Sequence, residues 1–382
     1  MDVQGAAGPM IPMSATQISF RTDASLQIGT GHVMRCLALA RELAAMGAQC
    51  RFICREHPGH LLSHVQACGF EAIGLAPSAE PAPRPGHGEP AHAEWLGASW
   101  RSDAEQTRLA LQDQPTDWLI VDHYGIDARW ESALRDRTAR LMVIDDLADR
   151  PHDADLLLDQ NLTSDAEARY RALVPAHCLL RLGPSQVVLR PEFDRVVPRP
   201  RTGAVQRVFV YFGGNDRHNL AGMALAALKH FPALQADIVL GRDHPHRSAV
   251  HLAALGWPKL QVLDSTDDML GLMAAADVGL GVCGMAAWER CAVGLPSLVC
   301  INADNQRADS LALHRLGAAE CLGDAADLSD ADWTDALARA LAQPTRLAHM
   351  AAVAATVVAG HTEHRHELLQ LLHCHEPRSL AA

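Results

Sequence analysis

Two halves of the chain repeat one pattern, in which a short apolar run is followed by a glycine-containing turn and then by an amphipathic segment of helical period. The first repeat opens with QISFRT at 17–22 and IGTGH at 28–32, and the second with RVFVYF at 207–212 and GGND at 213–216. Unbroken apolar strands are typical of parallel sheets that helices cover on both faces. We therefore predict an α/β fold with two Rossmann-like domains that face a cleft.

The length and the loop signals set the expected domain boundaries. A chain of 382 residues is long enough for two domains, at roughly 100–200 residues per domain. Periodicity is lost between 178 and 200, where VVPRPRTG at 196–203 breaks regular structure. We expect a disordered N-terminal extension at 1–16, a first domain at 17–195, a second at 204–360, and a C-terminal helix and tail at 361–382. The proline-rich stretch at 77–90 is expected to be a surface loop.

Hydrophobic periodicity and turn residues place the individual elements. Strands are expected at 17–22, 50–55, 71–75, 117–122, 141–145, 155–159, 207–212, 236–240, 260–263, 277–281 and 297–301. Helices are expected at 33–46, 59–68, 100–112, from 127 onward, and at 219–230, 267–275, 286–293, 305–316, 330–342, 344–358 and 363–373.

Composition excludes several classes of partner. The net charge of −12 disfavours non-specific binding to nucleic acid or to an anionic membrane. No apolar run approaches the roughly 20 residues of a membrane span, and the N-terminus lacks the basic segment of a signal peptide. The ten cysteines include no CxxC pair, which favours a reduced compartment. We expect a cytoplasmic protein without a nucleic-acid or membrane partner, and the sequence identifies no protein partner.

The first glycine turn combines an anion site with a titratable side chain. Gly29 and Gly31 let a ligand approach the backbone, and the following helix offers free N–H groups. The dinucleotide motif GxGxxG is not complete, because Met34 stands at its last position. His32 begins the helix, where the positive end of the dipole favours a neutral imidazole that can act as a general base. Arg35, one turn later, is expected to pair with a phosphate or a carboxylate.

Polar residues also follow the strands of the first half. Asp122, His123 and Tyr124 come directly after the strand at 117–122, on the edge that lines the ligand crevice of a doubly wound sheet. They are candidates for orienting His32 or for holding a sugar, and the alternative is that Asp122 caps the helix near Asp127. Asn161 follows another strand in the same way.

The second half carries three candidate nucleotide-binding segments. Gly213, Gly214, Asn215 and Asp216 form a turn whose amides suit a diphosphate, unless it is an ordinary β-turn. The segment from Gly284 begins a helix whose N-terminus suits a phosphate. Glu289 on that helix suits the ribose hydroxyls, unless it forms a solvated surface pair with Arg290. That segment contributes Gly284, Met285, Ala286 and Glu289, and the loop after the strand at 297–301 contributes Asn305 and Gln306.

Metal and cofactor sites are not expected. The paired aspartates at 145–146 lack a third ligand at convincing spacing. The histidine-rich C-terminus places His364 and His366 on different helix faces, so a solvated helix is favoured over a transition-metal site. The sequence contains no GxSxG, HExxH or P-loop motif, and we expect no cofactor.

Seven segments taken together resemble a known family. RTDASLQIGTGHVMRCLALARELAAMGA, LIVDHYGID, LLLDQN, LRLGPSQVVLRPEF, VYFGGNDRHNL, GMAAWERCAVGLPS and NADNQ occur in this order over about 19–320. They are similar to the UDP-sugar hydrolases of pseudaminic acid biosynthesis, whose fold resembles that of GT-B glycosyltransferases. The chain differs from the family pattern at Asn215, where Thr or Ser is commoner, and at Trp288, where some members have Asn.

The resemblance implies a reaction. Water attacks the anomeric carbon of UDP-2,4-diacetamido-2,4,6-trideoxy-β-L-altropyranose without a metal, and UDP leaves. His32 is then the catalytic base. The sugar side of the site includes Arg21, Asp23, Gly29, Gly31, Arg35, Asp122, His123, Tyr124 and Asn161, and UDP lies on the second domain. The alternatives are a GT-B glycosyltransferase that uses a UDP-amino sugar, and a nucleotide-sugar binding protein without catalysis.

Overall fold

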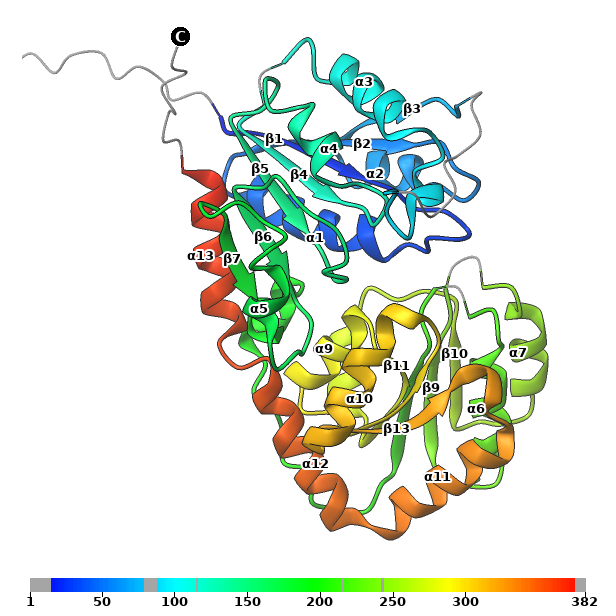
Figure 1. Ribbon diagram of the computed structural model, residues 1–382. Helices are drawn as coiled ribbons and strands as arrows, with labels where there is room; N and C mark the ends of the chain where they lie inside the picture. Colours follow the sequence, from blue (N-terminus) through cyan, green and yellow to red (C-terminus); the bar gives the residue numbers. More distant parts are fainter. Residues whose placement is uncertain (1–14, 79–87, 115, 215, 242–243, 375–382) are drawn as a thin grey trace, which may run out of the picture.

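The computed structural model describes residues 15–78, 88–114, 116–214, 216–241 and 244–374, and within them the chain forms two α/β domains (Figure 1). The first sheet has seven parallel strands in the order β3-β2-β1-β4-β5-β6-β7. Its strands are β1 (Gln17–Thr22), β2 (Gln49–Arg55), β3 (Glu71–Leu75), β4 (Trp118–Asp122), β5 (Arg140–Ile144), β6 (Leu156–Asp159) and β7 (Leu179–Leu182).

Helices lie on both faces of this first sheet (Figure 1). The longest of them, α1 (Gly31–Ala45), buries Val33, Leu37 and Leu43 against β1 and β2, as its apolar spacing predicts. The others are α2 (Leu62–Ala67), α3 (Trp100–Ala110), α4 (Ala128–Ser132) and α5 (Ala166–Tyr170), with 3₁₀ turns η1 (Ala93–Leu96), η2 (Pro184–Gln186) and η3 (Pro191–Arg195).

The second sheet has six parallel strands in the order β10-β9-β8-β11-β12-β13. Its strands are β8 (Arg207–Tyr211), β9 (Gln235–Val239), β10 (Leu260–Leu263), β11 (Val278–Val282), β12 (Ser297–Ile301) and β13 (Ala319–Asp324). Its helices are α6 (Leu220–Leu228), α7 (Arg247–Ala254), α8 (Met269–Ala275), α9 (Met285–Ala292), α10 (Arg307–Leu316), α11 (Asp330–Ala342) and α12 (Pro344–Val357), with 3₁₀ turns η4 (Asp304–Gln306) and η5 (Ala325–Asp327). The predicted fold class is confirmed.

The last described helix, α13 (His361–His373), returns to the first domain (Figure 1). Leu368, Leu369 and Leu372 join the apolar core of that domain, and Arg365 pairs with Glu42 of α1 and with Asp194. The chain therefore crosses between the domains twice, once near η3 and once between α12 and α13.

Both sheets reverse their strand order at one point, and these points fix where a ligand site belongs. In the first sheet the reversal lies between β1 and β4, and in the second between β8 and β11. Ligands of open α/β sheets bind beyond the carboxyl ends of the strands at such switch points. The glycine turns after β1 and β8, the loop after β4 and the start of α9 all lie there.

Several elements differ from the sequence prediction. The region from 178 onward is not wholly irregular, because Leu179–Leu182 forms the edge strand β7. The prediction also lacked α5, α7 and β13, which are short or polar: α7 buries only Val250, and β13 carries Glu320 and Asp324 at the edge of its sheet. Helix α2 starts at Leu62 rather than near Gly59, which packs tightly against Leu26.

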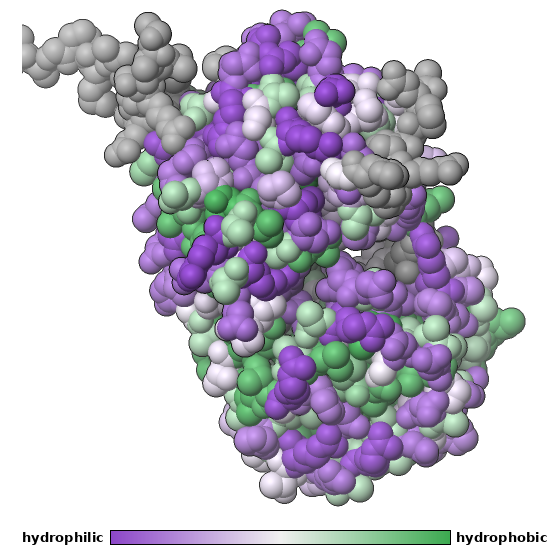
Figure 2. All heavy atoms as spheres, in the orientation of Figure 1, coloured by the Kyte–Doolittle hydropathy of each residue, from purple (hydrophilic) through white to green (hydrophobic). Residues whose placement is uncertain are grey.

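Three sequence expectations fall on residues outside the described ranges. They are most of the N-terminal extension, the centre of the proline-rich loop at 79–87, and the tail at 375–382. In the described part of the chain, no helix is both long and apolar enough to cross a membrane. Polar side chains cover most of the visible face of both domains, and apolar ones occur in small groups (Figure 2).

Candidate functional site

The side chain of His32 pairs with a carboxylate at the end of the neighbouring strand. His32 stands in the first turn of α1, and its Nδ1 lies 2.5 Å from Oδ1 of Asp122, the last residue of β4. The His32 ring is 8% exposed, and its Nε2 has no hydrogen-bond partner among the described residues. A carboxylate on Nδ1 favours the tautomer that leaves Nε2 as the proton acceptor.

Arg35 completes this pair from the next turn of α1. Its Nε and Nη2 donate to the two carboxylate oxygens of Asp122 at 2.5 and 2.7 Å, and its Nη1 donates to Asp146 at 3.0 Å. Burial alone would raise the pKa of Asp122, but Arg35 and His32 hold it well below its usual range. Asp122 is thus a charged group that fixes His32, and the alternative that it caps a helix is wrong. Asp127 caps α4 instead.

Tyr124 connects this group to the second domain. Its ring meets the His32 ring edge-on with centroids 4.6 Å apart, and its hydroxyl donates to Asp146 at 2.6 Å. Asn305, in the η4 turn of the second domain, donates to the same hydroxyl at 3.2 Å. Burial and the Asp146 carboxylate raise the pKa of Tyr124, so the phenol stays protonated. One hydrogen-bonded chain therefore runs from His32 across the interdomain boundary.

Arg21, Asp23 and His123 lie behind this group rather than at the boundary. Arg21 and Asp23 are fully buried and pair with each other at 2.6 Å, and Arg21 also holds Asp103. The Nε2 atom of His123 lies 3.3 Å from Asp23, and burial lowers the pKa of this imidazole. The expectation that Arg21 and Asp23 touch a sugar needs correction, because their polar atoms face other protein groups.

Asn161 also has a supporting position. Its amide donates to the backbone carbonyl of Asp146 at 2.6 Å, which fixes the loop after β5 on which Asp146 lies. Gln306 accepts a backbone hydrogen bond from Asn302 at 3.2 Å, so it supports the loop that carries Asn305.

The side chain of Asp216 points to the start of α6 rather than to the turn that precedes it. Asp216 is fully buried and accepts from the backbone N–H groups of Leu220 and Ala221 at 2.8 and 2.7 Å. Its carboxylate therefore caps the first turn of α6, and it faces His244 at 3.4 Å. The expectation that the Asp216 side chain contacts UDP is corrected, and the expectation that the backbone at Gly213 and Gly214 holds a diphosphate stays a prediction. Asn215 lies outside the described residues.

The start of α9 is open. Its N-cap is Gly284, no side chain caps the helix, and the first turn contains no acidic residue. A Cβ at Gly284 would meet no atom within 4 Å, which is also true of Gly29, Gly31 and Gly213. The amides of Met285 and Ala286 donate to no group among the residues that the structure describes, so they can bind an anion, and the helix dipole adds to the attraction.

Glu289, on α9, is buried rather than part of a solvated pair. Its Oε1 accepts from Nε of Arg190 at 3.0 Å, and Arg190 comes from the chain segment that joins the two domains. Arg290 is also buried, and its guanidinium donates hydrogen bonds to the Ser297 hydroxyl and to the backbone carbonyl of Val282. Trp288 is a core residue of the second domain.

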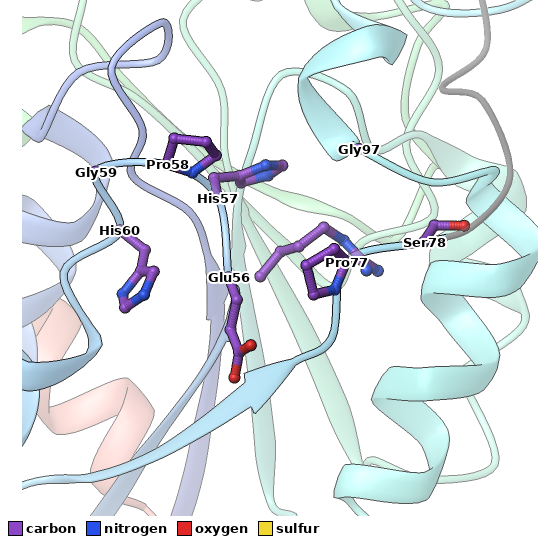
Figure 3. Close-up of a pocket in the computed structure, with 9 residues that line it drawn as sticks. Glu56, His57, Pro58, Gly59, His60, Pro77, Ser78 and Gly97 are labelled. Atoms are coloured by element: carbon purple, nitrogen blue, oxygen red, sulfur yellow. The ribbon is translucent and has the colours of Figure 1, made fainter.

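A cavity of about 560 Å³ lies beside the predicted site, within the first domain (Figure 3). It is bordered by His57, Pro58 and His60 after β2 and by Pro77 and Ser78 after β3. His57 is the link to the site, because its Nε2 lies 3.6 Å from the Asp23 carboxylate. None of the predicted site residues lines this cavity, and the contacts at the switch points lie outside it.

No cluster of three or more His, Cys, Asp or Glu side chains in the described part of the chain is arranged to hold a metal ion. The paired aspartates at 145–146 have other partners: Asp145 faces Arg150 and Tyr170, and Asp146 faces Arg35 and Tyr124. Metal independence stays a prediction.

Comparison with solved structures identifies the architecture. The chain aligns with LpCGTa in complex with UDP (TM-score 0.63, 16% identity, 95% of this chain and 100% of that one) and with MurG of Acinetobacter baumannii (0.63, 15%, 94% and 99%). Both have the two-domain GT-B arrangement. The chain has the GT-B fold. At these identities the likeness establishes the fold alone.

Comparison of sequences confirms the predicted resemblance. The chain is 28% identical over 205 residues to the UDP-2,4-diacetamido-2,4,6-trideoxy-beta-L-altropyranose hydrolase of Campylobacter jejuni, over 54% of this chain and 63% of that one. It is 28% identical over 165 residues to the spore coat polysaccharide biosynthesis protein SpsG of Bacillus subtilis, over 41% and 48%. The match thus spans about half to two thirds of the length of these relatives, and no protein-family profile matches the chain.

The structure adds residues that the predicted site did not include. His92 and Trp95, at η1, pack on Tyr124 with ring centroids 5.5 and 5.7 Å away. Burial lowers the pKa of His92. Asp146 joins Arg35 to Tyr124, and Arg190 holds Glu289. The sequence could have indicated only Asp146, because it follows the end of a strand. The other residues lie in loops, where no hydrophobic periodicity marks their position.

Proposed function

We propose that this protein hydrolyses the glycosyl–UDP bond of UDP-2,4-diacetamido-2,4,6-trideoxy-β-L-altropyranose, or of a closely related UDP-amino sugar, to UDP and the free sugar in pseudaminic acid biosynthesis. The observation that carries the proposal is the pairing of His32 with Asp122 at the switch point of a GT-B fold. The name of the Campylobacter jejuni relative supports the choice of substrate.

In the proposed reaction His32 is the general base. Its Nε2 accepts a proton from a water molecule as the water oxygen forms a bond to the anomeric carbon. The bond from that carbon to the diphosphate oxygen breaks, and UDP leaves with the electron pair. Asp122 stabilises the imidazolium that forms, and Arg35 keeps Asp122 ionised and oriented.

The second domain is proposed to hold the leaving group. The free amides at the start of α9, at Gly284, Met285 and Ala286, take the diphosphate. Glu289 accepts hydrogen bonds from the ribose hydroxyls. The glycines after β1 and β8 let the sugar and phosphates approach the backbone, since a Cβ at Gly29, Gly31 or Gly213 would project into open space.

A second candidate is a GT-B glycosyltransferase that hands the sugar to an acceptor. The fold favours it, because LpCGTa in complex with UDP and MurG share the architecture. The two candidates differ in what receives the anomeric carbon, which is water in one case and an acceptor hydroxyl in the other.

One assay tests the proposal. The purified protein is incubated with the UDP-sugar in oxygen-18-labelled water without any acceptor, and products are followed by mass spectrometry. The hydrolase releases stoichiometric UDP and puts the label on the anomeric hydroxyl of the free sugar. Label in the phosphate of a released nucleotide would instead mean attack at phosphorus. Turnover that appears only after an acceptor is added would identify the transferase.

A further inference from the structure

The carboxylate of Glu289 has one protein partner in the described chain. Its side chain is 11% exposed, its Oε1 accepts from Nε of Arg190 at 3.0 Å, and its Oε2 has no hydrogen-bond partner among the described residues. The pair spans 99 positions of sequence and joins the interdomain segment to α9. One oxygen is therefore fixed, and the other is available to a ligand.

Arg190 is itself held in place by its own segment. Its Nη1 lies 3.0 Å from Glu192, and its guanidinium carbon lies 5.3 Å above the Phe193 ring. Phe193 is buried in the core of the second domain. The cation thus has a defined position beside Glu289, which a flexible surface arginine would not have.

The charges around Glu289 act in opposite directions. The pKa of the Glu289 carboxyl is raised, because its burial outweighs the opposing effect of Arg190; Glu192 also raises it, and Arg290 on the same helix lowers it. Tyr211, at the end of β8, faces the same carboxylate, and burial raises the pKa of its phenol to about 12, so it brings no charge. Among these groups, Arg190 is the cation that most favours the ionised form of Glu289.

We propose that Arg190 is a positioning residue for ribose recognition, because its guanidinium fixes Oε1 and favours the charged form of Glu289, so that the carboxylate accepts both ribose hydroxyls of a uridine diphosphate. The inference rests on the proposed function, which assigns the ribose to Glu289. An ionised carboxylate is acceptor-only, whereas a protonated one donates from one oxygen and holds a diol less well.

Binding of two probes tests the inference: UDP, and 2′,3′-dideoxy-UDP, which lacks both hydroxyls. Affinities are measured by calorimetry at about pH 8 and about pH 6 for the wild type, Arg190→Met and Arg190→Lys. The wild type prefers UDP at both pH values. In Arg190→Met the ratio of UDP affinity to dideoxy-UDP affinity falls by about tenfold. The fall is larger at the lower pH, because the Glu289 carboxyl binds a proton more readily without its cation. Arg190→Lys restores part of the preference.

Two controls separate a local effect from a fold defect. Arg181→Met removes a cation from an ion pair with Glu367 that joins β7 to α13 in the first domain, and it leaves both affinities unchanged. Glu289→Gln abolishes the preference for UDP, and adding Arg190→Met to it produces no further loss. If Arg190→Met does not fold, Arg190→Gln carries the same comparison.

The outcomes distinguish the two proposals. A preference for UDP that Arg190→Met keeps in full at both pH values overturns the role of Arg190 and leaves the ribose assignment intact. A wild type that binds both probes equally overturns the ribose assignment of Glu289, and with it this inference. Hydrolysis of the UDP-sugar would still stand or fall by its own assay.

Discussion

The Nδ1 atom of His32 and the Oδ1 atom of Asp122 lie 2.5 Å apart, which joins the first turn of α1 to the end of β4 across 90 positions of sequence. The two residues meet because their strands, β1 and β4, are neighbours at the reversal point of the first sheet. This contact sets the tautomer of the imidazole. The proposed hydrolysis depends on it.

Asp122→Asn is expected to lower kcat by about 10²–10⁴-fold, because an amide does not stabilise the imidazolium and permits the wrong tautomer. UDP affinity should change little, since the proposed UDP site lies on the other domain. Steady-state kinetics and calorimetry measure the two effects. As a matched control, Asp267→Asn removes an exposed carboxylate and should keep the wild-type rate. Activity close to that of the wild type in Asp122→Asn would show that the pair has no catalytic role.

Gly284→Asp is expected to stabilise the protein and to weaken UDP binding. The backbone at Gly284 is extended, with φ −156 and ψ −159, and a Cβ there meets no neighbour, so aspartate fits as an N-cap. The cap should add about 0.5–1 kcal/mol to the free energy of unfolding. Its charge should repel a diphosphate and cost at least about tenfold in affinity. Denaturation and UDP titration test this, with the neutral cap Gly284→Asn as control. Unchanged UDP affinity in the aspartate variant would place the diphosphate elsewhere.

Titration of the Asp309 carboxyl is expected to make the free energy of unfolding depend on pH. It lies on α10 and accepts from the backbone N–H of Leu162 in the other domain at 2.8 Å, and burial raises its pKa to about 7. Between about pH 4 and pH 7 the folded carboxyl holds a proton that the unfolded one has lost, so stability falls as pH rises through this range.

Asp309→Asn removes the titrating group while an amide oxygen can still accept the Leu162 N–H. The loss of stability between about pH 5 and pH 8 should therefore shrink by on the order of 2 kcal/mol relative to the wild type. Urea denaturation at several pH values measures this difference. The inference about Asp309 fails if the variant and the wild type show parallel pH curves.

The fold was largely predictable from sequence because parallel strands buried on both faces leave unbroken apolar runs such as LIVD at 119–122. The place of His32 and Asp122 at one edge also followed from strand ends and turns. Their direct contact did not, because strand order is a long-range property. Asp216 is the clearest example of what the sequence could not predict. The GGND segment suggests a turn that binds an anion, and only the structure shows that the Asp216 carboxylate accepts from the first amides of α6.

Treatment with EDTA is expected to leave the hydrolysis rate within about twofold of the untreated enzyme, because the proposal assigns the diphosphate charge to amides at the start of α9. The assay follows UDP release before and after chelation and after addition of Mg²⁺ or Mn²⁺. A rate that collapses on chelation and recovers with either ion would contradict this assignment of the charge.

His32→Asn tests whether His32 is the general base, through paired measurements of UDP-sugar turnover and UDP affinity. We expect kcat to fall by about 10²–10⁴-fold while UDP affinity stays nearly unchanged. His230→Asn, at an exposed position after α6, should keep the wild-type rate. Release of free sugar by His32→Asn at the wild-type rate would contradict the account.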